Sequence, residues 1–102
     1  MKALLAVPAM LIAMNAAAAC PAKRPTEAPE MPAVATATEA DMAAAQTATQ
    51  AYVDGVVDFL DCRAYSMHDV EYNYFVDAAH AAAEKYNETL RAYKQREVLA
   101  SN

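Results

Sequence analysis

Apolar residues recur along two stretches of the chain at alternating steps of four and three residues, the spacing of a heptad seam on an α-helix. The first seam is Met42, Gln46, Thr49, Val53, Val56 and Leu60, and Ala45, Tyr52 and Phe59 widen it. The second seam is Tyr72, Val76, Ala79, Ala83, Tyr86, Leu90 and Tyr93. This pattern predicts one helical region, residues 38–98, with helices over residues 38–64 and 67–97.

Two residue pairs have the spacing of a capping box at the start of a helix. Thr38 precedes Asp41 by three residues, and Ser66 precedes Asp69 by three. In a capping box each side chain bonds the backbone N–H of the other residue. We therefore predict that Thr38 and Ser66 cap the two helices.

The break between the two seams is short, so the helices should pack as an antiparallel hairpin with coiled-coil spacing. Folding about residue 66 pairs Leu60 with Tyr72, Thr49 with Ala83 and Met42 with Leu90. The whole chain contains a single glycine. Because turn-rich β folds need many glycines, the composition also favours an all-α fold.

The first 19 residues have the features of a cleavable bacterial export signal. Lys2 supplies a positive start, residues 3–14 are apolar, and alanines at 16–19 precede Cys20. The apolar stretch is shorter than the roughly 20 residues that a membrane-spanning helix needs. We predict export to the periplasm with removal of residues 1–19.

Residues 20–37 carry four prolines, Pro21, Pro25, Pro29 and Pro32. Proline at this frequency blocks helix formation and favours an extended polyproline II course. The segment is either a flexible spacer or an arm that runs back along the hairpin. The predicted fold is an antiparallel two-helix hairpin with an extended proline-rich N-terminal arm.

The chain has two cysteines, Cys20 and Cys62. In an oxidising compartment they most simply form one disulfide. A helix rises about 36 Å from residue 38 to residue 62, whereas residues 20–37 span about 56 Å in polyproline II, so the arm is long enough. Two alternatives stay open: a lipid on Cys20, which would leave Cys62 as a free thiol, and an intermolecular bond through Cys62.

The charge of the chain is acidic. Without Lys2 it has seven basic and thirteen acidic residues, a net charge of −6. Nucleic acids and anionic lipids both attract basic patches, so we expect no nucleic-acid partner, and a membrane partner only if Cys20 is lipidated.

Catalytic, metal and cofactor motifs are lacking in the sequence. It has no HExxH, no CxxC and no glycine-rich loop, and His80 with Asp77 and Glu84 is more simply a surface histidine beside carboxylates. We therefore expect no enzyme activity, no metal and no cofactor. The best candidate contact surface is an exposed aromatic patch at the turn end, made of Tyr65, Tyr74 and Phe75.

Several short motifs spread over the mature chain carry a family resemblance. They are Cys20-Pro21, Thr38 to Met42, Tyr52, Phe59 to Cys62, Tyr86-Asn87 and Arg91 to Lys94. In these the chain resembles a group of small, uncharacterised exported helical proteins of alphaproteobacterial type. The resemblance implies a periplasmic helical protein with both cysteines paired, and it implies no activity.

Three functions remain as hypotheses. The first is a non-enzymatic periplasmic structural or interaction protein, with a homodimer or another envelope protein as partner. The second is an inhibitor or binding module for an envelope enzyme such as a cell-wall hydrolase, to which a fainter likeness to periplasmic lysozyme inhibitors points. The third is a lipid-anchored envelope protein.

The intact mass of the purified protein tests these predictions about the N-terminus. We expect a monomer that begins at Cys20 and is lighter by two hydrogen atoms than the same chain after reduction. A lipid-sized mass increment would show anchoring instead, and a doubled mass that reductant halves would show an intermolecular bond.

Overall fold

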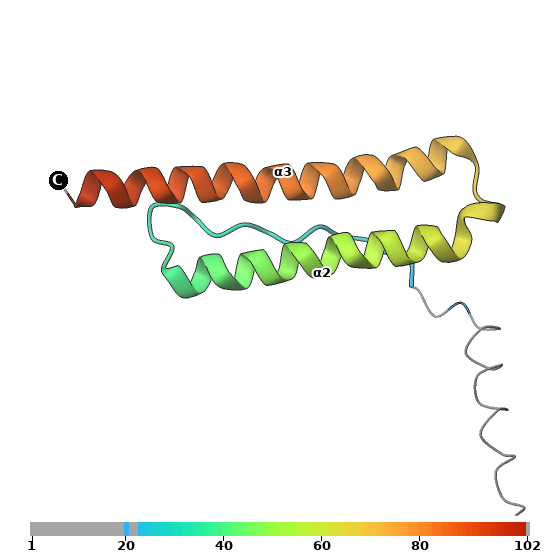
Figure 1. The fold of residues 1–102 in the computed structure, drawn as a ribbon, viewed down its shortest axis with the longest axis horizontal. Coiled ribbons are helices and arrows are strands. Elements are labelled where there is room, and N and C mark those ends of the chain that lie inside the picture. The colour runs from blue at the N-terminus through green and yellow to red at the C-terminus, as the bar shows by residue number, and fades with distance from the viewer. Residues whose placement is uncertain (1–19, 21–22, 102) are drawn as a thin grey trace, which may run out of the picture.

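The structure, a computed structural model, describes Cys20 and residues 23–101, and the predicted signal peptide lies outside these residues. The described part forms two long helices, α2 (Glu39–Arg63) and α3 (Asp69–Ala100), joined through the 3₁₀ turn η2 (Ala64–Ser66). The helices lie side by side and antiparallel, with residues 23–37 extended along them (Figure 1). The predicted fold, an all-α hairpin with an extended arm, is confirmed.

The start of α2 has the predicted cap. The backbone N–H of Asp41 donates to Oγ1 of Thr38, and the backbone N–H of Thr38 donates to Oδ2 of Asp41, each over 3.0 Å. Glu39 and Asp41 also place negative charge at the positive end of the helix dipole. The sequence therefore fixes where this helix begins.

The predicted cap of the second helix is wrong. Ser66 belongs to η2, and its hydroxyl donates to the carbonyl of Arg63 at 3.2 Å. Met67 then runs extended, and α3 begins at Asp69 with His68 as its N-cap residue. The physical reason is that Met67 packs against the core, which draws the chain inward before the helix can start.

The core lies at the turn end of the hairpin. Its buried residues are Val56, Phe59, Leu60 and Phe75, and Tyr52, Met67 and Ala79 pack around them. The rings of Phe59 and Phe75 meet edge to face, with centroids 5.1 Å apart. Aromatic pairs of this geometry stabilise beyond the area they bury.

The buried stripe of α3 is rotated from the predicted seam. Phe75 and Ala82 are its buried residues, whereas Val76 and Tyr72 are 41% and 39% exposed. The observed stripe follows Phe75, Ala79, Ala82 and Tyr86. It shares Ala79 and Tyr86 with the predicted seam, and it has Phe75 and Ala82 in place of Val76 and Ala83. The register of the hairpin is close to the predicted one, because Thr49 and Ala83 line one groove.

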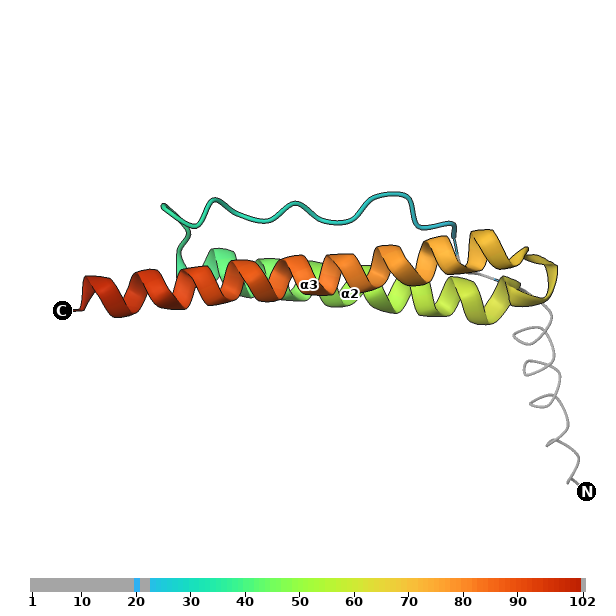
Figure 2. The same ribbon diagram turned by 90° about the horizontal axis from the view of Figure 1, so that it is seen from above.

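The arm covers one face of the two-helix layer, as Figure 2 shows from above. Ala37 is buried, and the half-buried residues of the arm are Pro25, Pro29, Met31, Pro32 and Val34. Met31 and Pro32 lie against Ala44, Ala45 and Ala48 of α2. The extended arm thus adds a third layer to a hairpin that has little core of its own.

Truncation of the core phenylalanine tests this packing. Phe75→Ala removes a side chain that is 2% exposed, so we expect the free energy of unfolding to fall by about 3–5 kcal/mol. Urea unfolding followed by circular dichroism measures it. Tyr65→Ala is the matched control, since Tyr65 is fully exposed and its loss should change the free energy by less than about 0.5 kcal/mol. Equal losses in both variants would contradict the assignment of the core.

Candidate functional site

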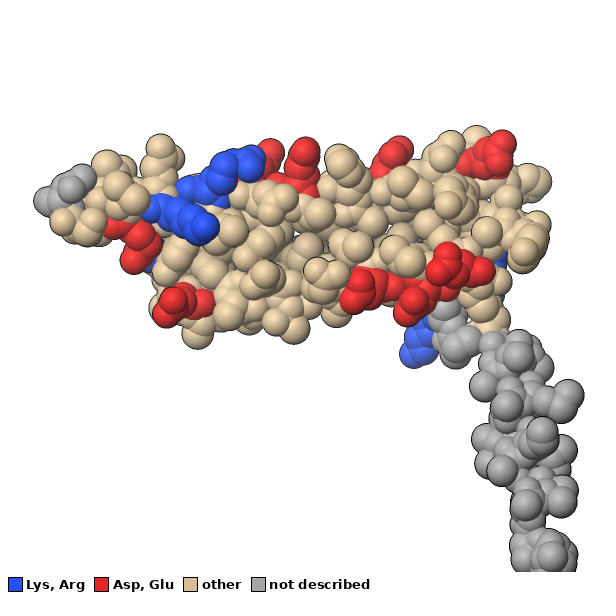
Figure 3. Space-filling view, viewed as in Figure 1, with Lys and Arg blue, Asp and Glu red and all other residues tan. Residues whose placement is uncertain are grey.

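The hairpin has two unlike faces. The arm lies along one of them, and it passes behind the helices in the view of Figure 1. We call the other side the open face, and define it by Val53 and Val57 of α2, by Tyr72 and Val76 of α3, and by the groove between the helices. Figure 3 shows this open face.

Three contacts hold the arm on its side of the hairpin. At the turn end, Cys20 is joined to Cys62, whose Cα atom lies 5.8 Å from that of Cys20. Next along the arm, Arg24 bonds Oε2 of Glu71 at 3.0 Å and lies 5.1 Å above the ring of Phe75. At the far end, Arg96 donates to the carbonyl of Val34 at 2.7 Å.

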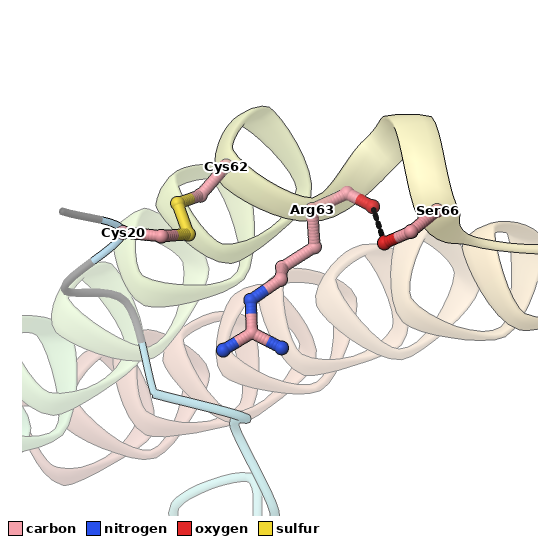
Figure 4. The surroundings of a disulfide bond; sticks show 4 residues. All are labelled: Cys20, Cys62, Arg63 and Ser66. Atoms are coloured by element: carbon pink, nitrogen blue, oxygen red, sulfur yellow. Dashed lines mark hydrogen bonds between the residues drawn. A yellow bond between two sulfur atoms is a disulfide. The ribbon is translucent and has the colours of Figure 1, made fainter. Parts of the chain in front are cut away.

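The first of these contacts is drawn in Figure 4. Cys62 lies near the end of α2, and the side chain of Arg63 extends beside the disulfide. The Arg63 guanidinium lies 5.7 Å from the centre of the Phe59 ring, so one side chain connects the disulfide region with the core. Exposed cation–π contacts of this kind contribute about 0.5–1 kcal/mol.

The arm is held more by its covalent link and its apolar contacts than by its ion pair. The side chains of Arg24 and Glu71 are 60% and 37% exposed. A pair so open to solvent contributes about 0–1 kcal/mol, because water and salt screen the two charges. The Arg96 bond to a backbone carbonyl is better shielded, since its guanidinium also stacks on the ring of Tyr93 at 4.9 Å.

A groove of about 260 Å³ lies at the middle of the open face, and we call it the central groove. It is lined by Gln46, Thr49, Gln50, Val53, Ala83, Tyr86 and Asn87. Thr49 is 6% exposed, and its Oγ1 atom is buried without a hydrogen-bond partner. A buried hydroxyl left unpaired costs about 1–3 kcal/mol. Because the Thr49 Oγ1 atom is shielded from solvent, it belongs to the packed floor of the central groove, and the exposed polar side chains around it are Gln46, Gln50 and Asn87.

Apolar side chains continue the open face toward the turn. Val57 is 48% exposed, and Tyr72 and Val76 are nearly as open. Val57 stands one helical turn after Val53 of the central groove, and Val76 stands two turns before Ala83. The open face therefore carries an apolar stripe beside a polar groove.

Charges are divided unevenly between the two ends of the hairpin. Residues 51–84, the turn half, contain seven acidic residues and a single basic one, Arg63. Residues 39–50 and 85–100, the other half, contain four of each sign. Figure 3 shows acidic groups gathered along α2 toward the turn, basic groups over the C-terminal half of α3, and uncharged surface between them.

The three residues of the predicted aromatic patch differ in exposure: two are exposed and one is buried. Tyr65 in η2 is fully exposed and Tyr74 in α3 is 63% exposed, so both are open to a partner. The prediction is wrong for Phe75, which is buried between the Phe59 ring and Arg24. Tyr74 contacts the edge of the Phe75 ring, with centroids 5.2 Å apart, and is thereby connected to the core.

Apart from the two cysteines, the residues that hold the arm and the polar residues that rim the central groove have no direct signal in the sequence. Arg24 and Arg96 stand beside other charged residues, and Asn87 belongs to a predicted motif only as the neighbour of Tyr86. One signal was present: Gln46 occupies a seam position that a heptad otherwise fills with an apolar residue. A polar residue at such a position indicates that the two helices do not form a purely apolar core at that level.

Among Cys20 and residues 23–101, no three His, Cys, Asp or Glu side chains are grouped so that they could hold a metal ion. Neither α2 nor α3 combines the length and the apolar character that a membrane span requires.

Comparison with known proteins found no match: no protein family, no curated protein and no solved structure is similar to this chain.

Loss of the disulfide tests how the arm is held. In the Cys20→Ser/Cys62→Ser double variant we expect the free energy of unfolding to fall by about 2–4 kcal/mol, because the unfolded chain regains the freedom of a closed loop of 42 residues. Hydrogen exchange should become faster in residues 23–37 before it does in α2. Reductant should destabilise the wild type and leave the double variant unchanged, and an equal effect on both would contradict the assignment.

Proposed function

We propose that this protein is an exported, non-enzymatic interaction protein that binds a protein partner on its open face. The observation that carries the proposal is the central groove with its polar rim, continued by the exposed valines of the same face. Contiguous apolar surface rimmed by polar groups is typical of protein interaction sites.

The contrast between the two faces supports this proposal. The chain covers one face with its own arm, at the cost of ordering some fifteen extended residues, yet it leaves comparable apolar side chains open on the other. A helix face that contacts only water usually carries polar residues. Polar side chains in place of Val57, Tyr72 and Val76 would therefore cost the fold little stability. Retaining them is understandable if a partner covers them.

The cysteine pair supports export. A disulfide that joins an arm to a helix persists in an oxidising compartment such as the periplasm. Lipidation of Cys20 would use the same Sγ atom that bonds Cys62, so the lipid-anchored alternative and the observed pairing exclude each other. The resemblance of the Cys20-Pro21 start to exported helical proteins points the same way.

One observation favours a second function, that of an inhibitor or binding module for an envelope enzyme. Tyr65 projects fully exposed from η2, and Tyr74 is largely exposed near it in sequence. Protruding tyrosines are enriched at the centres of protein interfaces. This function would place the contact at the turn end instead of the open face.

Site-specific photo-cross-linking in a Gram-negative host tests the proposal. The full chain is expressed with a photoreactive phenylalanine analogue at position 57, 76, 65 or 70. We expect covalent adducts in the periplasmic fraction from positions 57 and 76, because a bound partner covers the open face.

Position 70 is the matched control. Val70 is 82% exposed on α3 and lies about 120° around the helix from Val76, away from the open face. Adducts from position 65 alone would favour the inhibitor function. Equal yields from all four positions, or a protein retained in the cytoplasm, would contradict the proposal.

A further inference from the structure

The geometry points to a second copy of this chain as the partner on the open face, packed antiparallel to form a four-helix bundle. This inference rests on the proposed function and names its partner. It is argued from the position of the central groove, from its hydrogen-bonding groups, from the charges of the two halves and from the area of the face.

The central groove lies where a two-fold axis has to pass if two copies are to overlap fully. Its α2 residues extend from 46 to 53, around Ala51 at the middle of that helix, and its α3 residues extend from 83 to 87, at the middle of α3. An interface between identical chains uses the same patch on both copies, centred on the axis. Face-to-face packing about this axis sets α2 on α2 and α3 on α3.

The central groove carries groups that can form hydrogen bonds across an interface between two copies. Gln46, Gln50 and Asn87 carry amides that each donate and accept hydrogen bonds, and the Tyr86 hydroxyl does the same. Gln50 lies at the axis and therefore meets its own copy, so that each Gln50 amide can donate to the other and accept from it without any further group. A buried polar layer of this kind within an apolar seam fixes register and oligomeric state in coiled coils.

The charges select the antiparallel arrangement. A parallel pair would set the acidic turn half of one copy on the acidic turn half of the other, with seven carboxylates against seven. The antiparallel pair sets the acidic turn half of α3 against the half of α3 that holds Lys85, Arg91 and Lys94. On α2 it sets the acidic turn half against residues 39–50, which hold two acidic residues, so fewer carboxylates face one another than in the parallel pair. Figure 3 shows basic groups over the C-terminal half of α3 and acidic groups in both halves of the open face, most densely along α2 toward the turn. Like charges in contact oppose association, whereas opposite charges steer it.

The open face is also large enough. A helix of the length of α2 measures about 37 Å, and two helices packed side by side are about 18 Å wide. The projected area is therefore about 700 Å² for each copy, close to the roughly 800 Å² per partner of a standard interface. The arm lies on the opposite side and leaves this area free.

In this arrangement the small and large side chains of the stripe are complementary. An axis near Gln50 and Ala83 places Val57 of one copy over Ala43 of the other, and Val76 beside Leu90. Ala83 meets its own copy, which lets the two α3 helices approach closely. The exposed valines are thereby buried, and water is excluded from the central groove.

Sedimentation velocity of the oxidised mature chain over a concentration series tests the inference. We expect a dimer, and an increase of more than about 100-fold in its dissociation constant for Val76→Asp and for Val57→Asp, because each change buries two carboxylates per dimer. Both positions are solvent-exposed in the single chain, so circular dichroism should show the same helix content in all variants. Val70→Asp, the same change outside the open face, should leave the dissociation constant within about twofold.

The orientation is tested with the cross-linker at position 57. A mixture of isotope-labelled and unlabelled chains distinguishes adducts between copies from adducts within one. We expect the inter-copy adduct near Ala43. An adduct near Phe75 would show parallel packing and overturn the antiparallel arrangement.

The outcomes separate this inference from the function on which it rests. A monomer at every concentration, or a Val70→Asp effect as large as that of Val76→Asp, would overturn the second copy as partner. If positions 57 and 76 then still form adducts with a different envelope protein, the proposed interaction function stands with another partner. If those positions form no adduct, both fail.

Discussion

The covalent link between Cys20 and Cys62 fixes the arm at the turn end of the hairpin, and the packing of the rest depends on the course that the arm then takes. Two helices side by side bury one stripe on each and leave two faces to water. The link directs the arm along one of these faces, where Ala37 is buried and Arg24 lies over Phe75. The packed part of the molecule thus consists of the hairpin together with the extended arm, and the open face keeps its apolar stripe.

Much of this fold follows from the sequence. Two examples are the cap at Thr38 and the register of the hairpin, which brings Thr49 and Ala83 to the same groove. The buried side of α3 does not, and alanine is the reason. The stripe through Val76 and Ala83 and the stripe through Phe75 and Ala82 have the same spacing and are equally apolar, so periodicity cannot choose between them. The choice is made by the arm, which covers the hairpin on the side of Phe75 and leaves Val76 on the other.

The candidate site was less accessible to prediction than the fold. Gln46 indicates an irregular position in the first seam, but Asn87 and Gln50 are ordinary helix-surface residues until the register sets them around Thr49. A groove between helices depends on which side chains face one another across the pair, and that is decided by tertiary packing. Exposure of Tyr65 and Tyr74 was foreseeable from their place near the turn, whereas the burial of Phe75 required knowledge of the arm.

The disulfide also determines how the molecule would respond to a pulling force. Tension applied between Cys20 and the C-terminal end passes through the two sulfur atoms, so residues 21–61, which include all of α2 except its last two residues, carry no load. Only the chain from residue 62 onward can be drawn out, to a contour length of about 140 Å. Under tension α3 would peel away from the hairpin while the arm and α2 stay closed as a ring, which makes the molecule a short tether with a built-in limit to its extension.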